Sequence, residues 1–168
     1  MVECGKPVIY LYPTQTIPVS VKVGAAIRKS EPMYPADGWK VIAEPSGKLT
    51  YQQKTYPNLF WEGTGRGSYP DYRDYGVVVD QGRVLPTLYL QMTALGLNAQ
   101  EQADFMEFWQ SRLPKTPYVR LTWLGTREMD VLAPLTVLPK PDTTIRVFLE
   151  FEGLSQPKTV QPQLLTAP

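Results

Sequence analysis

Four carboxylates bracket a segment rich in glycine and tyrosine: Glu62, Asp71, Asp74 and Asp80. Paired carboxylates carry out acid and base steps in glycoside hydrolysis, and neighbouring aromatic rings can stack on sugars. Oxygen ligands of this kind also suit Ca²⁺, but neither the EF-hand pattern nor another fixed ligand spacing is present. We therefore interpret the carboxylates as solvated loop and strand-end residues, and predict no metal site and no cofactor. A carboxylate-dependent hydrolase acting on glycans is the alternative function.

The segment itself, residues 63–76, reads GTGRGSYPDYRDYG and contains Asp71 and Asp74, while Glu62 and Asp80 flank it. Its glycines permit positive φ, and a tyrosine recurs at every third position from residue 69. Irregular segments of this length in a compact domain are more often functional or mobile than structural filler. Tyrosine-rich loops are typical of contact surfaces, because each ring offers a rigid apolar body with one polar group. We predict a binding surface made of Tyr69, Tyr72, Tyr75, Arg66 and Arg73.

The chain contains no histidine, one cysteine, ten tyrosines and four tryptophans. Histidine is the commonest general base near neutral pH, so its absence excludes Ser-His-Asp and Cys-His catalysis and histidine metal sites. The tryptophans all fall on predicted strands or a helix, and we expect them in the core. This composition favours a non-enzymatic binding or structural module.

The charge pattern excludes one class of partner. The 17 basic and 16 acidic residues are scattered, giving a net charge of +1, and no basic stripe is available to neutralise phosphates. No apolar run approaches the length of a membrane span, and no signal peptide is visible. We therefore expect a protein or carbohydrate ligand, no nucleic acid and no transmembrane segment; the oligomeric state is left open.

Two further patterns have some residue types of reactive sites. Cys4 and Gln91 have the residue types of an internal thioester, but an ordinary helix face produces the same pattern around Gln91 and is the preferred interpretation. The glycines of 63–67 are not followed by Gly-Lys-Ser/Thr or by a helix, so a phosphate-binding loop is excluded. The lone cysteine argues against an internal disulfide.

Short β-branched and aromatic runs separated by turn residues predict β-strands in the first half. Residues 24–37, with prolines and small side chains, are predicted to be a loop. Pro18 interrupts an alternating strand and suggests that this strand lies at a sheet edge. The predicted strands are 7–12, 17–23, 38–43, 49–51, 58–63 and 77–79.

Two consecutive helices are predicted after these strands, at about 86–95 and 99–113. Gly96 ends the first helix, while Asn98 and Glu101 have the spacing of a capping box at the start of the second. Apolar residues of the second helix recur on one stripe.

Strands return at 118–123, 131–138 and 144–151. Strands, then helices, then strands predict an α+β domain with a mainly antiparallel sheet and both helices packed on one face. We expect a single domain over 1–155 and an extended or disordered C-terminal tail over 156–168, which holds three prolines and few core residues.

Several segments together resemble an uncharacterised bacterial domain family. They are KPVIYLYP at 6–13, GWKVIA at 38–43, LFWEG at 59–63, GLN at 96–98 and PKPDTTIRV at 139–147. The resemblance covers nearly the whole chain. It implies a bacterial source and, loosely, an exported or envelope-associated protein, and it supplies no catalytic residues.

Overall fold

A computed structural model describes residues 3–4, 7–68 and 71–168. The chain divides into two compact units. The first, here called the helical unit, comprises residues 1–5, 70–125 and 149–168; the second, the sheet unit, comprises 6–69 and 126–148. Strand β12 (Thr143–Leu154) contributes its first half to the sheet unit and its second half to the helical unit.

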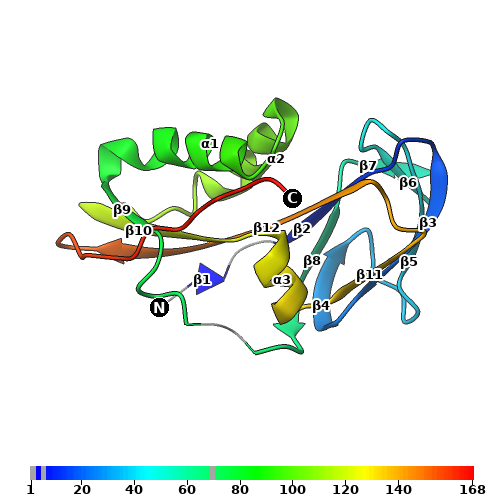
Figure 1. Cartoon of the computed structure of the whole chain (residues 1–168), viewed down its shortest axis with the longest axis horizontal. Coiled ribbons are helices and arrows are strands. Elements are labelled where there is room, and N and C mark those ends of the chain that lie inside the picture. The colour runs from blue at the N-terminus through cyan, green and yellow to red at the C-terminus, as the bar shows by residue number, and fades with distance from the viewer. Residues whose placement is uncertain (1–2, 5–6, 69–70) are drawn as a thin grey trace. The chain divides into compact units, whose positions relative to one another are not determined.

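In the helical unit, β10 (Tyr118–Leu124) lies between β9 (Val77–Asp80) and the second half of β12 (Figure 1). Strand β1 (Glu3–Cys4) pairs with β12 in antiparallel fashion, as β9 does with β10. Six of the seven residues of β10 are buried, so both faces of this strand are covered. A strand covered on both faces places polar side chains inside as well as apolar ones, and Arg120 is one of them.

Two α-helices and one short helix join β9 to β10 in this unit: η1 (Gln81–Arg83), α1 (Val84–Ala94) and α2 (Ala99–Trp109). Helix α1 ends in a Schellman arrangement, with the Gly96 amide donating to Thr93 and the Leu97 amide to Met92. Gly96 has a φ of 88° there. The predicted capping box is confirmed, since the Asn98 side chain and Glu101 bond each other's main-chain amides. No helix among the described residues is long and apolar enough to cross a membrane.

Aromatic rings fill the core of the helical unit. Phe105 of α2 lies 5.2 Å from Trp123 of β10, and Trp109 lies 5.6 Å from Phe151 of β12. The Trp123 indole also donates to the side-chain oxygen of Gln91 at 2.8 Å. Burial of all four tryptophans, at 3% exposure or less, confirms that they belong to the core.

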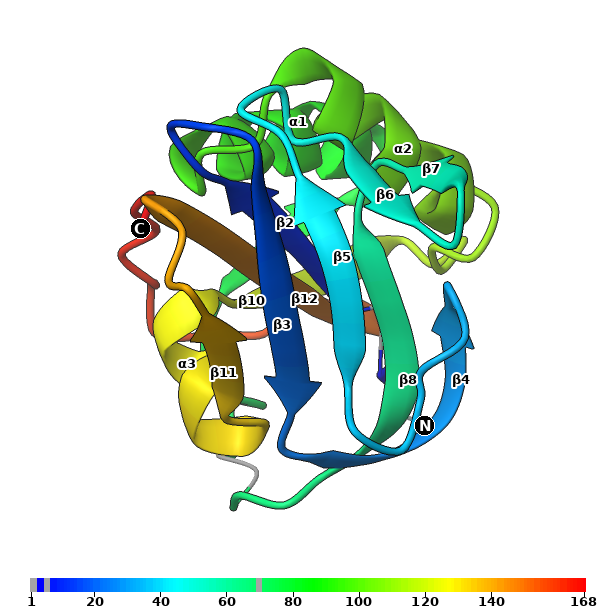
Figure 2. The same cartoon turned by 90° about the vertical axis from the view of Figure 1, so that its right-hand side faces the viewer.

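The sheet unit contains two layers of strands (Figure 2). In one layer the order is β4 (Ala25–Glu31), β8 (Leu59–Gly65), β2 (Val8–Tyr12) and the first half of β12. In the other, within the described residues, five strands follow the order β11 (Leu135–Leu138), β3 (Ile17–Val23), β5 (Trp39–Ala43), β6 (Leu49–Tyr51) and β7 (Lys54–Tyr56). Alternate residues of β3 and β5 are buried, as expected for strands with one face on a core. The fold is therefore α+β with mainly antiparallel sheets.

Two predictions for the sheet unit were wrong. Residues 25–31 form strand β4, although a loop was predicted. Their pattern does not alternate, because the strand lies at the sheet edge and its register shifts between Ile27 and Lys29. Pro18 does not mark an edge strand either, since β3 lies between β11 and β5. The pairing with β11 extends only from Ser20 to Val23, so no partner on that side requires an N–H from Pro18.

The strand predicted over 131–138 is also only partly correct. Residues Thr126–Leu132 form helix α3, and only Leu135–Leu138 form a strand. Met129 and Leu132 are buried at a spacing of three residues, as one face of a helix requires. Pro134 follows the helix end, where a proline is commonly found.

A buried arginine from β12 holds this short helix. Arg146 is 1% exposed, and its guanidinium donates to the Asp130 carboxylate at 2.5 Å and to the Ala133 carbonyl at 2.7 Å. The main-chain amide of Arg146 also donates to the hydroxyl of Thr126 at 3.1 Å. A cation near the last carbonyls of a helix satisfies groups that have no intrahelical donor. Arg146 therefore acts as a C-terminal cap of α3 supplied from another element.

Candidate binding loop

The predicted loop 63–76 is divided between the two units. Gly63 and Gly65 are residues of β8 in the sheet unit, where Arg66 follows them with an exposed side chain. Residues 71–76 belong to the helical unit. Tyr69 lies outside the described residues. We call residues 71–76 the tyrosine turn, because they contain the two described tyrosines of the predicted binding surface.

Close packing explains three of the four glycines in this segment. A Cβ at Gly63, Gly65 or Gly67 would lie 2.1 Å, 2.4 Å or 1.9 Å from a main-chain carbonyl oxygen, of Ala26, Leu132 and Val131 respectively. All four glycines permit positive φ, but only Gly76 adopts it, at 118°. The alternation of glycines at 63, 65 and 67 thus lets neighbouring main chain approach, including the last residues of α3.

The tyrosine turn carries an exposed ring, a half-buried ring and an exposed ion pair. The Tyr72 and Tyr75 rings meet edge to face with centroids 5.9 Å apart, and the Tyr75 amide donates to the Tyr72 carbonyl at 2.9 Å. Asp71 and Arg73 form a two-point ion pair at 2.7 and 2.9 Å. Tyr75 is 36% exposed, and both charged side chains are more than half exposed. Aromatic and polar groups are therefore available at one surface.

The ion pair shifts the acid–base equilibria of both partners. Hydrogen bonds from Arg73 lower the pKa of Asp71 to about 2, from an ordinary value of 3.8. The same pairing raises the pKa of Arg73. Asp71 is therefore ionised at all but strongly acidic pH. A carboxylate of this kind is unsuited to donate a proton as a general acid, which requires a raised pKa.

A buried polar network lies beneath the turn. Thr122 of β10 donates its hydroxyl to the Tyr75 carbonyl at 2.7 Å. Its hydroxyl oxygen accepts from the guanidinium of Arg120, which also bonds Glu150 at 2.8 Å and Glu152 at 3.2 Å. Arg120 is 0% exposed and Glu150 is 1% exposed. The network fixes the main chain of the turn to the interior of the helical unit.

Sequence reasoning missed this network. Arg120, Thr122 and Glu150 alternate with apolar residues along their strands, and no role was predicted for them. Such alternation is typical of a sheet with one solvated face, whereas β10 is covered on both faces. The sequence did contain one indication of the network. Polar residues stand at 120 and 122 of one predicted strand and at 150 of another, and the residues at 120 and 150 have opposite charges.

The four predicted carboxylates do not form a described cluster. Glu62 lies in the sheet unit at the position opposite Lys29 of β4, whereas the other three lie in the helical unit. Asp74 pairs with Lys158 at 3.3 Å, and Asp80 precedes η1 with an exposed side chain. Across the described residues, no group of three or more acidic, cysteine or histidine side chains could hold a metal ion.

The Gln91 side chain, considered with Cys4 as a thioester pair, has a structural partner. Its oxygen accepts the Trp123 indole N–H at 2.8 Å. This contact agrees with the interpretation of Gln91 as part of an ordinary helix face.

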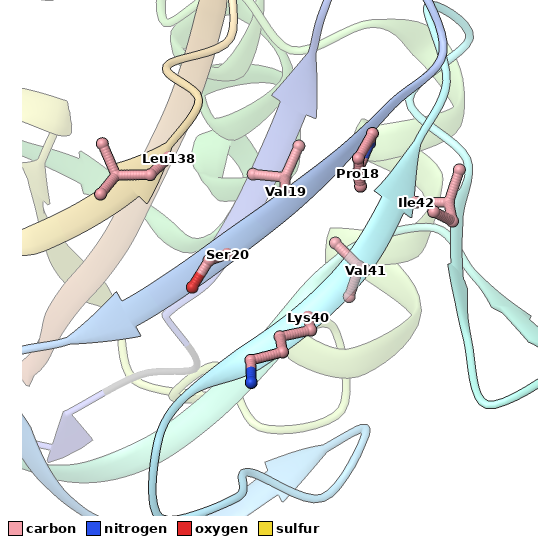
Figure 3. Close-up of a pocket in the computed structure, with 7 residues that line it drawn as sticks. All are labelled: Pro18, Val19, Ser20, Lys40, Val41, Ile42 and Leu138. Carbon is pink, nitrogen blue, oxygen red and sulfur yellow. The ribbon is translucent and has the colours of Figure 1, made fainter.

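The sheet unit carries a separate open groove on its five-stranded layer (Figure 3). The groove has a volume of about 330 Å³. Leu138 is 63% and Ile42 is 40% exposed there, and the Lys40 ammonium pairs with Asp37 at 2.9 Å. The lining is mostly apolar and comprises Pro18, Val19, Ser20, Lys40, Val41, Ile42 and Leu138.

Comparison with known proteins gives one relative. The chain is 44% identical over 62 residues to an uncharacterised protein encoded in the bglA 3' region of Butyrivibrio fibrisolvens. The match covers 34% of this chain and 65% of the relative, so the chain spans about two thirds of that protein's length. No family model matches the chain, and no solved structure matches it significantly. The relative agrees with the resemblance to an uncharacterised bacterial domain.

Proposed function

We propose that this protein is a non-enzymatic binding module of a bacterial protein, and that the tyrosine turn is its contact surface. One observation carries the proposal: an exposed tyrosine ring, a half-buried one and a charged pair stand on a main chain that a buried network holds from beneath. Binding loops gain affinity when their conformation is fixed before the ligand arrives, because less conformational entropy is lost on binding. Tyr72, Tyr75 and Arg73 are the proposed contact residues.

An uncharged carbohydrate suits this surface best. Arg73 is paired with Asp71, and Lys158 is paired with Asp74, so the charges of the turn cancel locally. Tyrosine rings can stack on sugar faces, while a carboxylate and a guanidinium held side by side offer acceptors and donors to neighbouring hydroxyls. A protein ligand is the alternative, and a nucleic acid is disfavoured because no uncompensated basic patch is supplied by the turn.

The hydrolase alternative finds less support. Glycoside hydrolysis requires one carboxyl group that keeps its proton near neutral pH. The pKa of Asp71 is shifted in the opposite direction, and Asp74 faces a lysine ammonium. These two carboxylates suit ligand binding and loop structure better than proton transfer.

The proposal includes an architecture for the module. The ring contacts of α2 with Trp123 and Phe151, and the hydrogen bond of Gln91 in α1 with Trp123, support an arrangement in which α1 and α2 cover one face of the strands β9, β10 and β12 (Figure 1). We further propose that residues 1–155 act as one α+β domain, that 156–168 form an extended tail, and that the protein is exported or associated with the cell envelope.

Affinity electrophoresis tests the ligand class. The full chain is run in native gels containing laminarin, xylan or hydroxyethylcellulose, and its mobility is compared with that in a gel without polysaccharide. We expect retardation by at least one of these, and loss of about tenfold or more in affinity for Tyr72→Ala and Tyr75→Ala because stacking is lost. Tyr89→Ala is the matched control, since Tyr89 is 44% exposed on α1 and lies outside the turn.

Equal retardation of all three variants would place the sugar site elsewhere and contradict the proposal. If no polysaccharide retards the protein, the same variants are compared by crosslinking to an envelope extract. Crosslinks that depend on Tyr72 and Tyr75 but not on Tyr89 would indicate the protein ligand instead.

A further inference from the structure

The C-terminal segment 158–163 follows the main chain of the tyrosine turn. The Gln161 amide donates to the Asp74 carbonyl at 2.7 Å, and the Gly76 amide donates to the Gln161 carbonyl at 2.9 Å. Tyr75 and Gln161 form a parallel β-bridge. The Lys158 ammonium donates to the Arg73 carbonyl at 2.8 Å. An extended segment is thus paired to the turn as an added strand is paired to a sheet edge.

Gln163 continues this pairing with its side chain. Its amide oxygen accepts from the Trp123 main-chain N–H at 2.9 Å, and its amide nitrogen donates to the Trp123 carbonyl at 2.8 Å. One donor and one acceptor on the same planar group reproduce the hydrogen bonds of a neighbouring strand. Strand β9 pairs with β10 only as far as Leu121. Gln163 therefore satisfies a stretch of β10 that β9 leaves unpaired.

Little apolar surface holds the segment in place. None of residues 156–168 is buried, and Leu164 is 91% exposed. Segments with few buried contacts and hydrogen bonds near solvent open at a low free energy compared with the core. The attachment consists of main-chain pairing, one lysine and one glutamine side chain, which are the interactions that another extended peptide can supply.

We propose that the edge formed by residues 73–76 and Trp123 is a binding slot for an extended peptide, which the chain's own residues 158–163 occupy in the closed state. The partner is a polypeptide segment with a glutamine two residues after the residue that pairs with Tyr75. The slot uses the main chain of the turn, so the inference does not depend on the ligand proposed for the tyrosine side chains. The C-terminal segment acts as an internal competitor for the partner.

A labelled peptide tests the slot in the full-length chain. A fluorescein-labelled peptide of sequence QPKTVQPQLLTAP, residues 156–168, is titrated with the wild-type chain and with Gln163→Ala, and binding is followed by anisotropy. The substitution removes two hydrogen bonds of the internal competitor, so we expect the variant to bind the peptide about tenfold or more tightly than wild type. Leu164→Ala is the matched control and is expected to behave as wild type.

A second peptide, with alanine in place of the glutamine that corresponds to Gln163, is expected to bind Gln163→Ala about tenfold more weakly than the wild-type peptide. Equal binding of both peptides, or of the wild-type peptide to all three chains, overturns the proposal. So does the absence of binding to Gln163→Ala.

Hydrogen exchange of the wild-type chain gives a test that needs no variant. We expect the Gly76 and Gln161 amides to exchange at least a hundredfold faster than the amides of β10. Exchange of these two amides at the rate of β10 would show that the segment does not open separately, and the slot would be rejected. This result would leave the tyrosine side chains as a candidate ligand surface, so the two proposals fail independently.

Discussion

Arg120 in the helical unit and Arg146 in the sheet unit are both buried arginines on β-strands, and each bonds a neighbouring segment of its own unit, the tyrosine turn through Thr122 in one case and helix α3 in the other. Arg120 is bonded to two carboxylates, of which Glu150 is only 1% exposed. Arg146 has one carboxylate partner, Asp130, which is 54% exposed. The charges of the first pair are thus enclosed together, whereas the second arginine reaches a carboxylate that water also reaches.

The remaining donors of the two guanidinium groups differ as well. Arg120 reaches the Thr122 hydroxyl, which supports the Tyr75 carbonyl of the tyrosine turn. Arg146 donates to the Ala133 carbonyl at the end of α3, and its Nε has no hydrogen-bond partner among the described residues. Burial lowers the pKa of Arg146, while the bond to Asp130 opposes the shift. Arg120 therefore balances the buried charge of Glu150, whereas Arg146 mainly caps helix α3.

Replacing Arg120 should have the largest effect. Arg120→Met leaves Glu150 buried without its guanidinium partner, which typically costs about 3–5 kcal/mol of unfolding free energy. Guanidinium chloride unfolding, followed by tryptophan fluorescence, measures the loss. A cost below about 1 kcal/mol would mean that Glu150 becomes protonated or hydrated at little expense, and the contrast with Arg146 would disappear.

The double variant Arg120→Met, Glu150→Met sharpens this prediction. Replacing both members of a buried ion pair by apolar side chains is often nearly neutral. We expect the double variant to recover most of the stability that Arg120→Met loses. If both variants are equally unstable, the loss comes from packing rather than from the Glu150 carboxylate that has lost its arginine.

Replacing Arg146 should cost less. In Arg146→Met the carboxylate of Asp130 remains hydrated, and the main loss is the charge-assisted bond to the Ala133 carbonyl, so we expect about 1–2 kcal/mol. Amide exchange should accelerate selectively in α3, because its C-terminal carbonyl loses a donor. Arg127→Met is the matched control, since Arg127 is an exposed arginine on the same helix. Comparable effects of the two substitutions would contradict the capping role.

The two threonines that accompany the arginines provide a smaller and closely matched comparison. Thr122 is 0% exposed, whereas Thr126 is half-buried. Thr122→Val removes the donor to the Tyr75 carbonyl and should cost about 1 kcal/mol, with faster exchange in the tyrosine turn. Thr126→Val should cost less, because water can replace the lost hydroxyl at the Arg146 main chain. Both variants are compared by urea unfolding and by amide exchange; a larger cost for Thr126→Val would reverse the proposed ranking.

The sequence predicted the parts of the fold that local patterns encode. The capping box of Asn98 and Glu101 and the stop at Gly96 depend on residues a few positions apart, and both were predicted correctly. Helix α3 was not, because seven residues containing two buried positions give a weak period and Pro134 suggested an interrupted strand. Strand β4 was missed because an edge strand with a register shift does not alternate.

The candidate site was predicted only at its surface. Tyrosines, charges and glycines marked the segment, but the groups that hold it come from positions far along the chain, at 120, 122, 161 and 163. Glycines at 63, 65 and 67 suggested free backbone torsions. In the structure each of them instead leaves room for a main-chain carbonyl oxygen that a Cβ would meet. Alternation along a strand cannot reveal whether its second face is covered. The burial of Arg120 was therefore not predicted.

The smallest effect concerns the exposed pair of Asp71 and Arg73, which contrasts with the buried pair of Arg120 and Glu150. The pKa of Asp71 is lowered from 3.8 to about 2 in the folded chain. Ionised Asp71 therefore stabilises the folded state, in which it pairs with Arg73, above about pH 4, and this contribution is lost as the pH falls from about 4 to about 2. Because both side chains are exposed, salt should screen the pair and bring the pKa back toward 3.8, whereas the enclosed Arg120 pair should respond little to salt. Carboxyl-carbon NMR titration of the Asp71 side chain measures its pKa at low and at high ionic strength, with Asp71→Asn used to assign the signal. A titration at 3.8 in low salt would show that the pair is not populated in solution, and the turn would then present a free guanidinium rather than a neutral surface.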